Sequence, residues 1–226
     1  MLWRGGPYGG KKYFSRYAPP RLPDGPDGEH LPDRLATETV KFIEKNRKGP
    51  FLAYLSFYDF HTPLMPRDDL RKKCEKKAKG LKSVAERWGK ERANKVRLVQ
   101  DHAVYAGMVE AMDQAVGKVL RALEHLKLDG RTIVVFTSDN GGLSTSEGHP
   151  TSNLPSRAGK GWLYDGGVRV PWIMRAPGVT KAESACAEPV VSTDFFPTLL
   201  ALTGRRPPAK VTIDGRPLVP LLKGRS

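Results

Sequence analysis

An apolar run that stops at a polar turn is the strongest constraint in this sequence, at Thr132–Gly142 (TIVVFTSDNGG). Five of the six residues in Ile133–Ser138 favour a pleated, buried strand. The following glycine pair forces a turn, which leaves Asp139 and Asn140 at the carboxyl end of the strand. Open α/β sheets bind ligands at that edge, and side-chain oxygens there suit a hard cation such as calcium or magnesium. The plainer alternative is that both residues only initiate the turn.

A second apolar run, Phe51–Phe57 (FLAYLSF), is the next candidate strand, and His61 follows it. Pro63 and Pro66 would stiffen the loop that carries this histidine. In a parallel sheet the carboxyl ends of the strands open on one edge, so His61 and Asp139 can converge on one crevice. The alternative is an exposed loop histidine without a role.

Lys160 stands between two glycines in Arg157–Trp162 (RAGKGW). Glycine lets the backbone approach a ligand closely, and lysine supplies a compact positive charge for an anion. The alternative is a flexible basic loop. Weaker candidates are Arg157 and Arg169 as structural ion-pair partners, His149 as an exposed residue near a site mouth, and Asp59 as a turn residue.

Helical periodicity fills the segments between the strands. Asp33–Asn46 and His102–Leu126 place apolar residues on one side at a 3.6-residue period, and Ser192–Leu202 is a shorter helix. Val170–Met174 is a third candidate strand. The alternation predicts an α/β fold with a largely parallel sheet flanked by helices, in one domain because no linker divides the chain. Residues 1–28, rich in Gly and Pro, are expected to be irregular.

Positive charge is concentrated in one segment of this 226-residue chain, whose net charge is +14. Arg71–Arg97 holds twelve Lys/Arg against three Glu and few apolar residues, so we expect an exposed, largely helical basic insertion. It is either a solvated face or a patch that attracts a polyanion, such as a sulfated or phosphorylated substrate. Nucleic acid is not expected, because the sequence has neither a nucleic-acid motif nor an aromatic stacking platform.

Several classes of protein are disfavoured by what the sequence lacks. No apolar run approaches the length of a membrane span, and the first residues lack the apolar core of a signal peptide. Cys74 and Cys186 lie far apart and define neither a zinc spacing nor a disulfide framework. The sequence therefore does not indicate the cellular compartment of the protein.

The order of motifs resembles one family. A His-Thr-Pro loop, a helix reading YAGMVEAMDQAVGKVL, the TIVVFTSDNGG run and then SNLPSRAGKGWLYDGGVRVP are similar to the type I sulfatases, the arylsulfatase family within the alkaline-phosphatase-like superfamily. The resemblance covers roughly Leu31–Leu222. It implies that Asp139 and Asn140 bind a divalent cation, usually calcium, with magnesium as the other candidate. It implies that His61 and Lys160 contact the sulfate ester and its leaving oxygen.

The sequence also departs from that family. Members begin with a strand bearing paired aspartates, followed by Cys-x-Pro-Ser-Arg or its serine form, whose first residue becomes the formylglycine nucleophile. Neither cysteine here stands in such a sequence, and formylglycine is not encoded in this chain. Asp165 occupies a position where the family usually has Glu. The resemblance thus implies a partial catalytic domain over residues 1–226, with the basic insertion at 71–97, that lacks the N-terminal third.

Our interpretation is a sulfatase-family protein that hydrolyses sulfate esters of small molecules or glycans in its intact form. Alone, the chain is expected to have little activity, because it supplies only the later half of the active site. A separately encoded N-terminal half is a candidate partner. The main alternative is a non-catalytic module that binds sulfated glycans or another polyanion. A phosphoesterase of the same superfamily is a third and less favoured alternative, because its metal sites usually need more Asp and His ligands than this sequence shows.

Overall fold

The structure is a computed structural model that describes residues 13–15, 22–82 and 86–224. The chain divides into two compact units: Met1–Asp129 with Thr137–Trp172, and Gly130–Phe136 with Ile173–Ser226. Every candidate site residue from the sequence belongs to the first unit. Within the described ranges, no helix has the length and apolar character that crossing a bilayer requires.

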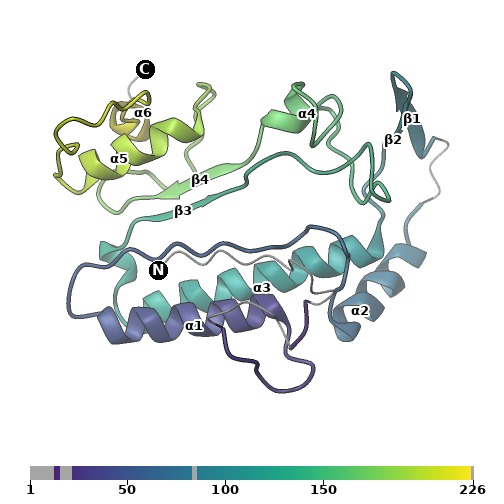
Figure 1. The fold of residues 1–226 in the computed structure, drawn as a ribbon, viewed down its shortest axis with the longest axis horizontal. Coiled ribbons are helices and arrows are strands. Elements are labelled where there is room, and N and C mark those ends of the chain that lie inside the picture. Colours follow the sequence, from purple (N-terminus) through teal and green to yellow (C-terminus); the bar gives the residue numbers. More distant parts are fainter. Residues whose placement is uncertain (1–12, 16–21, 83–85, 225–226) are drawn as a thin grey trace. The chain divides into compact units, whose positions relative to one another are not determined.

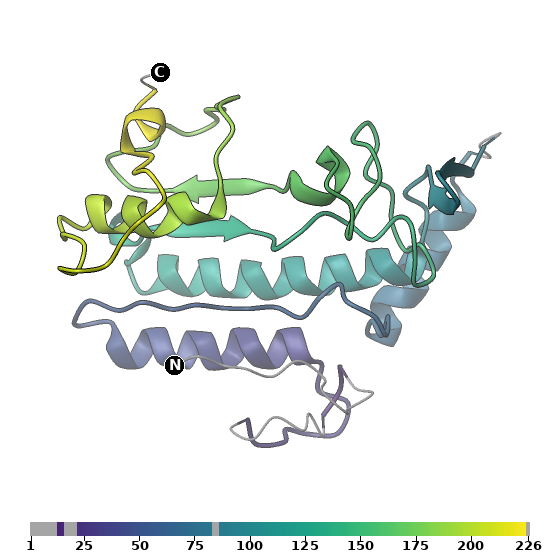
Figure 2. The same cartoon turned by 45° about the horizontal axis from the view of Figure 1, so that its top comes forward.

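Two long helices form the body of the first unit and lie side by side (Figures 1 and 2). These are α1 (Leu31–Asn46) and α3 (Ala103–His125), close to the two predicted helices. The side chain of His102 caps α3 by accepting a hydrogen bond from the backbone N–H of Tyr105. The buried face of α3 carries mainly small residues, which lets its neighbours approach closely; its buried members are Gly107, Met108, Ala111, Ala115 and Leu123.

The basic segment is only partly helical, which corrects the prediction. Helix α2 (Asp68–Lys79) packs near the start of α3 (Figure 1). The rest of the described segment forms an antiparallel hairpin of β1 (Trp88–Glu91) and β2 (Asn94–Arg97). The two-residue turn contains Arg92 at φ 53° instead of the Asn-Gly or Asp-Gly pair typical of such turns, so no turn motif indicated a hairpin here.

The remaining elements follow α3 in the chain. They are a 3₁₀ turn at Asp129–Arg131, β3 (Val134–Thr137), α4 (Asp165–Val168) and β4 (Trp172–Arg175), then a 3₁₀ turn at Ser192–Asp194, α5 (Phe195–Leu202) and α6 (Val219–Leu222). Strands β3 and β4 pair in a two-stranded sheet, close to the two predicted strands. In the second unit, the carboxylate of Asp194 accepts hydrogen bonds from the backbone N–H groups of Val191 and Arg216 and so ties α5 to the following loop.

The predicted strand Phe51–Phe57 is not a strand in the structure, where this segment has no ladder partner among the described residues. A strand needs a neighbour for its backbone N–H and C=O groups, and sequence hydrophobicity does not show whether one is present. Leu52 and Tyr54 are 76% and 75% exposed, while Leu55 and Phe57 pack against a core that includes Leu35 and Met108. The described residues form two two-stranded sheets, so the largely parallel sheet stays a prediction.

The irregular structure expected over residues 1–28 can be followed only at 13–15 and 22–28. There the chain makes bends and turns, and Phe14 forms an isolated bridge with His30. The other residues of that segment lie outside the described part.

Candidate functional site

The polar turn after β3 is organised by its own side chains. Asp139 and Asn140 follow the last residue of the strand, Thr137, as the sequence predicts. The Asp139 Oδ1 atom accepts hydrogen bonds from the backbone N–H and the Nδ2 group of Asn140, at 2.9 and 3.1 Å. These bonds fix the two side chains relative to each other and leave Asp139 Oδ2 and Asn140 Oδ1 without a hydrogen-bond partner in the described residues.

Close backbone packing holds this turn against the loop that carries Lys160. The N–H of Lys160 donates to the carbonyl of Gly142 at 3.0 Å, and the N–H of Gly141 donates to the carbonyl of Gly167 at 2.9 Å. A Cβ atom at Gly141 would lie 1.8 Å from the carbonyl oxygen of Gly166, and one at Gly159 would lie 2.2 Å from that of Gly142. These close approaches require glycine at positions 141 and 159. The backbone hydrogen bond from Lys160 to Gly142 places the half-buried Lys160 next to the Asp139–Asn140 turn.

Asn153 joins these loops through its side-chain amide, and no sequence pattern predicted this role. Its amide oxygen accepts from the N–H of Gly142 at 3.1 Å, while its Nδ2 group donates to the carbonyls of Gly142 and Ala158, at 2.8 Å each. Only a primary amide both accepts and donates in this way. In the sequence, Asn153 stands in an ordinary polar loop, and such a position predicts no particular role.

His61 lies in an exposed loop that contacts the stretch following the Asp139 turn. The Oγ1 atom of Thr62 donates to Glu147 at 2.7 Å, and the hydroxyl of Tyr13 donates to the carbonyl of His61 at 2.8 Å. The His61 Nδ1 atom lies 2.9 Å from the carbonyl of Thr62, which favours a proton on Nδ1 and leaves Nε2 free to exchange one. The structure therefore links the His61 loop to the chain beyond Gly142, while its convergence with Lys160 on one crevice stays a prediction.

Asp59 is not simply a turn residue, because its carboxylate is buried next to the His61 loop. Neither oxygen has a hydrogen-bond partner in the described residues. Burial raises the pKa of Asp59 from 3.8 to about 7, with a smaller contribution from Asp33. The carboxyl group therefore titrates near neutral pH in the folded protein.

Replacing Asp59 with asparagine should stabilise the protein at pH 8 and leave it almost unchanged at pH 4. The pKa of Asp59 rises to about 7 on folding. At any pH where this carboxyl group is ionised in the unfolded chain but still protonated in the folded protein, ionisation favours the unfolded chain and so destabilises the fold. This penalty is absent below about pH 4 and complete above about pH 7, and at about 1.36 kcal/mol per pKa unit it amounts to roughly 2–4 kcal/mol. Thermal melts at both pH values measure it. The exposed Asp27→Asn is the control, and a lower melting temperature of Asp59→Asn at pH 8 would contradict the interpretation.

The other candidates from the sequence have structural contacts. Arg157 is an ion-pair partner, as predicted: its guanidinium donates to both carboxylate oxygens of Glu91 at 2.7 Å. Asp165 accepts from the N–H groups of Arg157 and Gly166, and the first of these bonds is the main cause of its lowered pKa. The ring of His149 packs edge-on against Trp88, with centroids 5.5 Å apart. The N–H of Arg169 donates to the carbonyl of Asp165 at 2.8 Å.

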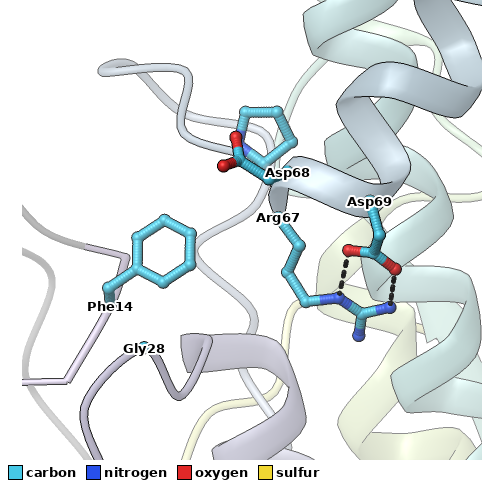
Figure 3. Close-up of a pocket in the computed structure, with 6 residues that line it drawn as sticks. Phe14, Gly28, Arg67, Asp68 and Asp69 are labelled. Carbon is cyan, nitrogen blue, oxygen red and sulfur yellow. Dashed lines mark hydrogen bonds and ion pairs between the residues drawn. The ribbon is translucent and has the colours of Figure 1, made fainter.

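A cavity of about 430 Å³ lies apart from these residues, beside the start of α2, and is lined by Phe14, Gly28, Pro66, Arg67, Asp68 and Asp69 (Figure 3). Its one basic side chain, Arg67, is already paired with Asp69 at 3.1 and 3.2 Å and with Asp33 at 2.9 Å. These bonds raise the pKa of Arg67 and neutralise its charge. We therefore assign this cavity to the structure of the first unit and not to the chemistry.

Metal binding at the Asp139–Asn140 turn stays a prediction. Calcium prefers six to eight oxygen ligands, and Asp139 with Asn140 offers two free side-chain oxygens and one negative charge. The described residues contain no group of three or more His, Cys, Asp or Glu that could hold a metal ion. The two residues fit as part of a cation site and do not fit as a complete one.

Comparisons with known proteins agree on one family. The family model described as Sulfatase matches residues 4–205. Steryl-sulfatase of Homo sapiens is 36% identical over 203 residues, which is 88% of this chain and 30% of that protein. A sulfatase of Formosa agariphila is 38% identical over 211 residues, or 88% of this chain and 34% of that protein. The chain thus spans about a third of the length of these curated relatives.

Solved structures give the same result for the fold. Ps i-CgsB, solved in complex with k-i-k-neocarrahexaose, has a TM-score of 0.73 and 31% identity, covering 91% of this chain and 41% of that one. The Bacteroides fragilis protein yidJ has a TM-score of 0.68 at 25% identity over 92% of this chain and 44% of that one.

Proposed function

Because this chain belongs to the sulfatase family, we propose that it forms part of an enzyme that hydrolyses sulfate esters, and that His61 and Lys160 act on the leaving oxygen. The observation that carries the proposal is the backbone pairing of the Lys160 loop with the Asp139–Asn140 turn, through Gly142 and Gly141. It brings the ammonium group of Lys160 and two oxygen ligands to one loop cluster, where they can act on the single negative charge of a sulfate ester.

The two proposed catalytic residues have different tasks. Cleavage of the ester S–O bond leaves negative charge on the departing oxygen, and the compact ammonium of Lys160 can neutralise that charge. In its imidazolium form His61 can deliver the proton on Nε2 and return to the neutral ring, whose remaining proton on Nδ1 is held by the carbonyl of Thr62. General acid help of this kind contributes about 10²–10⁴-fold.

We assign Asp139 and Asn140 as two ligands of a divalent cation, with calcium preferred over magnesium. A bound cation would polarise the sulfate oxygens. The remaining ligands would come from outside the described residues, which hold no group of three or more His, Cys, Asp or Glu that could bind a metal ion. The nucleophile would also come from outside, because neither Cys74 nor Cys186 stands in a sequence that resembles the family's formylglycine motif.

The proposal is tested by turnover of an activated aryl sulfate. We expect the 226-residue chain alone to show negligible turnover, and a protein that joins this chain to a segment bearing the nucleophile to be active. Purified chain that turns over the ester, and loses activity in Lys160→Ala, would refute the assignment of an external nucleophile. Lack of turnover in the joined protein, together with binding of a sulfated glycan, would favour the non-catalytic alternative.

Removal of the divalent cation from the active protein is the second arm of this test. A chelator should abolish turnover, and added calcium should restore it more fully than magnesium. Turnover that resists the chelator would refute the metal assignment, whereas it would leave the roles of His61 and Lys160 intact.

A further inference from the structure

One face of the β1–β2 hairpin gathers three cationic side chains, of which Lys90 and Lys95 have no ion-pair partner in the described part of the chain. The strand register pairs Trp88 with Arg97 and Lys90 with Lys95. Because side chains alternate between the two faces of a strand, these four residues share one face. Like charges directly opposite each other destabilise a strand pair, so the Lys90–Lys95 pair costs stability unless an anion lies between them.

Aromatic contacts hold these cations in place. The Lys95 Nζ atom lies 3.9 Å from the centroid of the Trp88 ring, and the Arg97 guanidinium carbon lies 4.8 Å from it. Arg97 is also bonded to Asp101 and to the carbonyl of His149, which neutralises its charge. By contrast, Lys90 and Lys95 have no ion-pair partner within the described ranges.

The opposite face anchors the hairpin to the loop of Lys160. Glu91 accepts two hydrogen bonds from Arg157, which precedes Lys160 by three positions. The Arg92 guanidinium lies 5.7 Å from the ring centroid of Trp162, which follows Lys160 by two positions. The lysine pair is therefore positioned relative to the proposed catalytic lysine by an ion pair and a cation–aromatic contact.

A hollow of about 350 Å³ opens beside this face and is lined by Trp88, Gly89, Lys90, Ala93 and Lys95. We propose that Lys90 and Lys95 bind a second anionic group of the substrate, so that the preferred sulfate ester is an oligosaccharide with several sulfates. The proposal rests on the proposed function and names its substrate class. A saccharide with several sulfates offers a further anion away from the reacting ester, whereas a compound with one sulfate offers none.

The test compares two substrates in the active protein that contains this chain. In the double variant Lys90→Gln/Lys95→Gln, kcat/KM for a multiply sulfated oligosaccharide should fall about 10-fold, mainly through KM. With a singly charged aryl sulfate, kcat/KM should stay within about 2-fold, since that ester cannot reach the pair.

Lys76→Gln/Lys77→Gln on α2 is the matched control, because it removes the same charge from exposed lysines of the same basic segment. An equal loss in both double variants would overturn the proposal in favour of general attraction. An equal loss with both substrates, or no loss with either, would also overturn it.

Direct binding separates this proposal from the proposed function. If the protein hydrolyses neither ester, calorimetry with the sulfated oligosaccharide and its desulfated form still measures how much Lys90 and Lys95 contribute to binding. Binding that needs the sulfates and is weakened in Lys90→Gln/Lys95→Gln supports the pair. A single-stranded oligonucleotide that competes equally well would overturn the assignment to a saccharide.

Discussion

Lys160→Ala and His61→Ala should each lower kcat for an aryl sulfate with a poor leaving group by about 10²–10⁴-fold in the active protein. The departing oxygen of such an ester needs a proton or a neighbouring positive charge before it can leave. An activated aryl sulfate releases a stabilised anion unaided, so the loss with that ester should be much smaller for His61→Ala. Steady-state kinetics with a series of leaving groups measures this difference.

The exposed Lys181→Ala removes the same charge elsewhere and is the control, with activity expected to stay within about 2-fold. A loss in His61→Ala that is equal for every leaving group would contradict proton donation and indicate a binding role. Full activity in Lys160→Ala would remove Lys160 from the proposed site.

Gly141→Ala should destabilise the protein by about 3 kcal/mol or more, at the upper end of the cost of overpacking. The new Cβ would lie 1.8 Å from the carbonyl oxygen of Gly166 and 3.2 Å from the Cα atom of Gly167. Both obstacles are backbone atoms, so the clash can be relieved only by separating the two loops. That separation breaks the backbone hydrogen bond from the N–H of Gly141 to the carbonyl of Gly167. Urea unfolding measures the loss.

Gly130→Ala is the matched control, since nothing lies within 4 Å of the added carbon there. It should change the free energy of unfolding by less than about 1 kcal/mol, in either direction. Equal stability of the two variants would contradict the close backbone contact between Gly141 and Gly166.

Periodicity predicted the elements that carry a regular apolar pattern. Helices α1 and α3 and strands β3 and β4 lie within a few residues of their predicted bounds. The same signal failed at Phe51–Phe57, where residues suited to a strand have no ladder partner among the described residues. It also failed at the hairpin, because its buried residues Glu91 and Arg97 are charged, so the apolar–polar alternation that normally marks a strand is absent.

The candidate site was predictable only where backbone chemistry demands a residue type. The glycines after Asn140 predicted a turn, and those around Lys160 predicted a close approach to a ligand; in the structure they allow the backbones of these two loops to approach each other. By contrast, the hub at Asn153 and the ion pair of Glu91 with Arg157 join positions 5 to 66 residues apart. Each depends on how distant segments fold together, and no local pattern around either residue encodes it.

The attachment of the hairpin has a consequence for engineering. Glu91 and Arg157 are the bidentate link between the hairpin and the loop that bears the proposed catalytic lysine. The outward side chains at positions 90 and 95 take no part in that link. These two positions can therefore be varied: a library at positions 90 and 95 that retains Glu91 and Arg97 would change substrate preference without rebuilding the chemistry beside the hairpin.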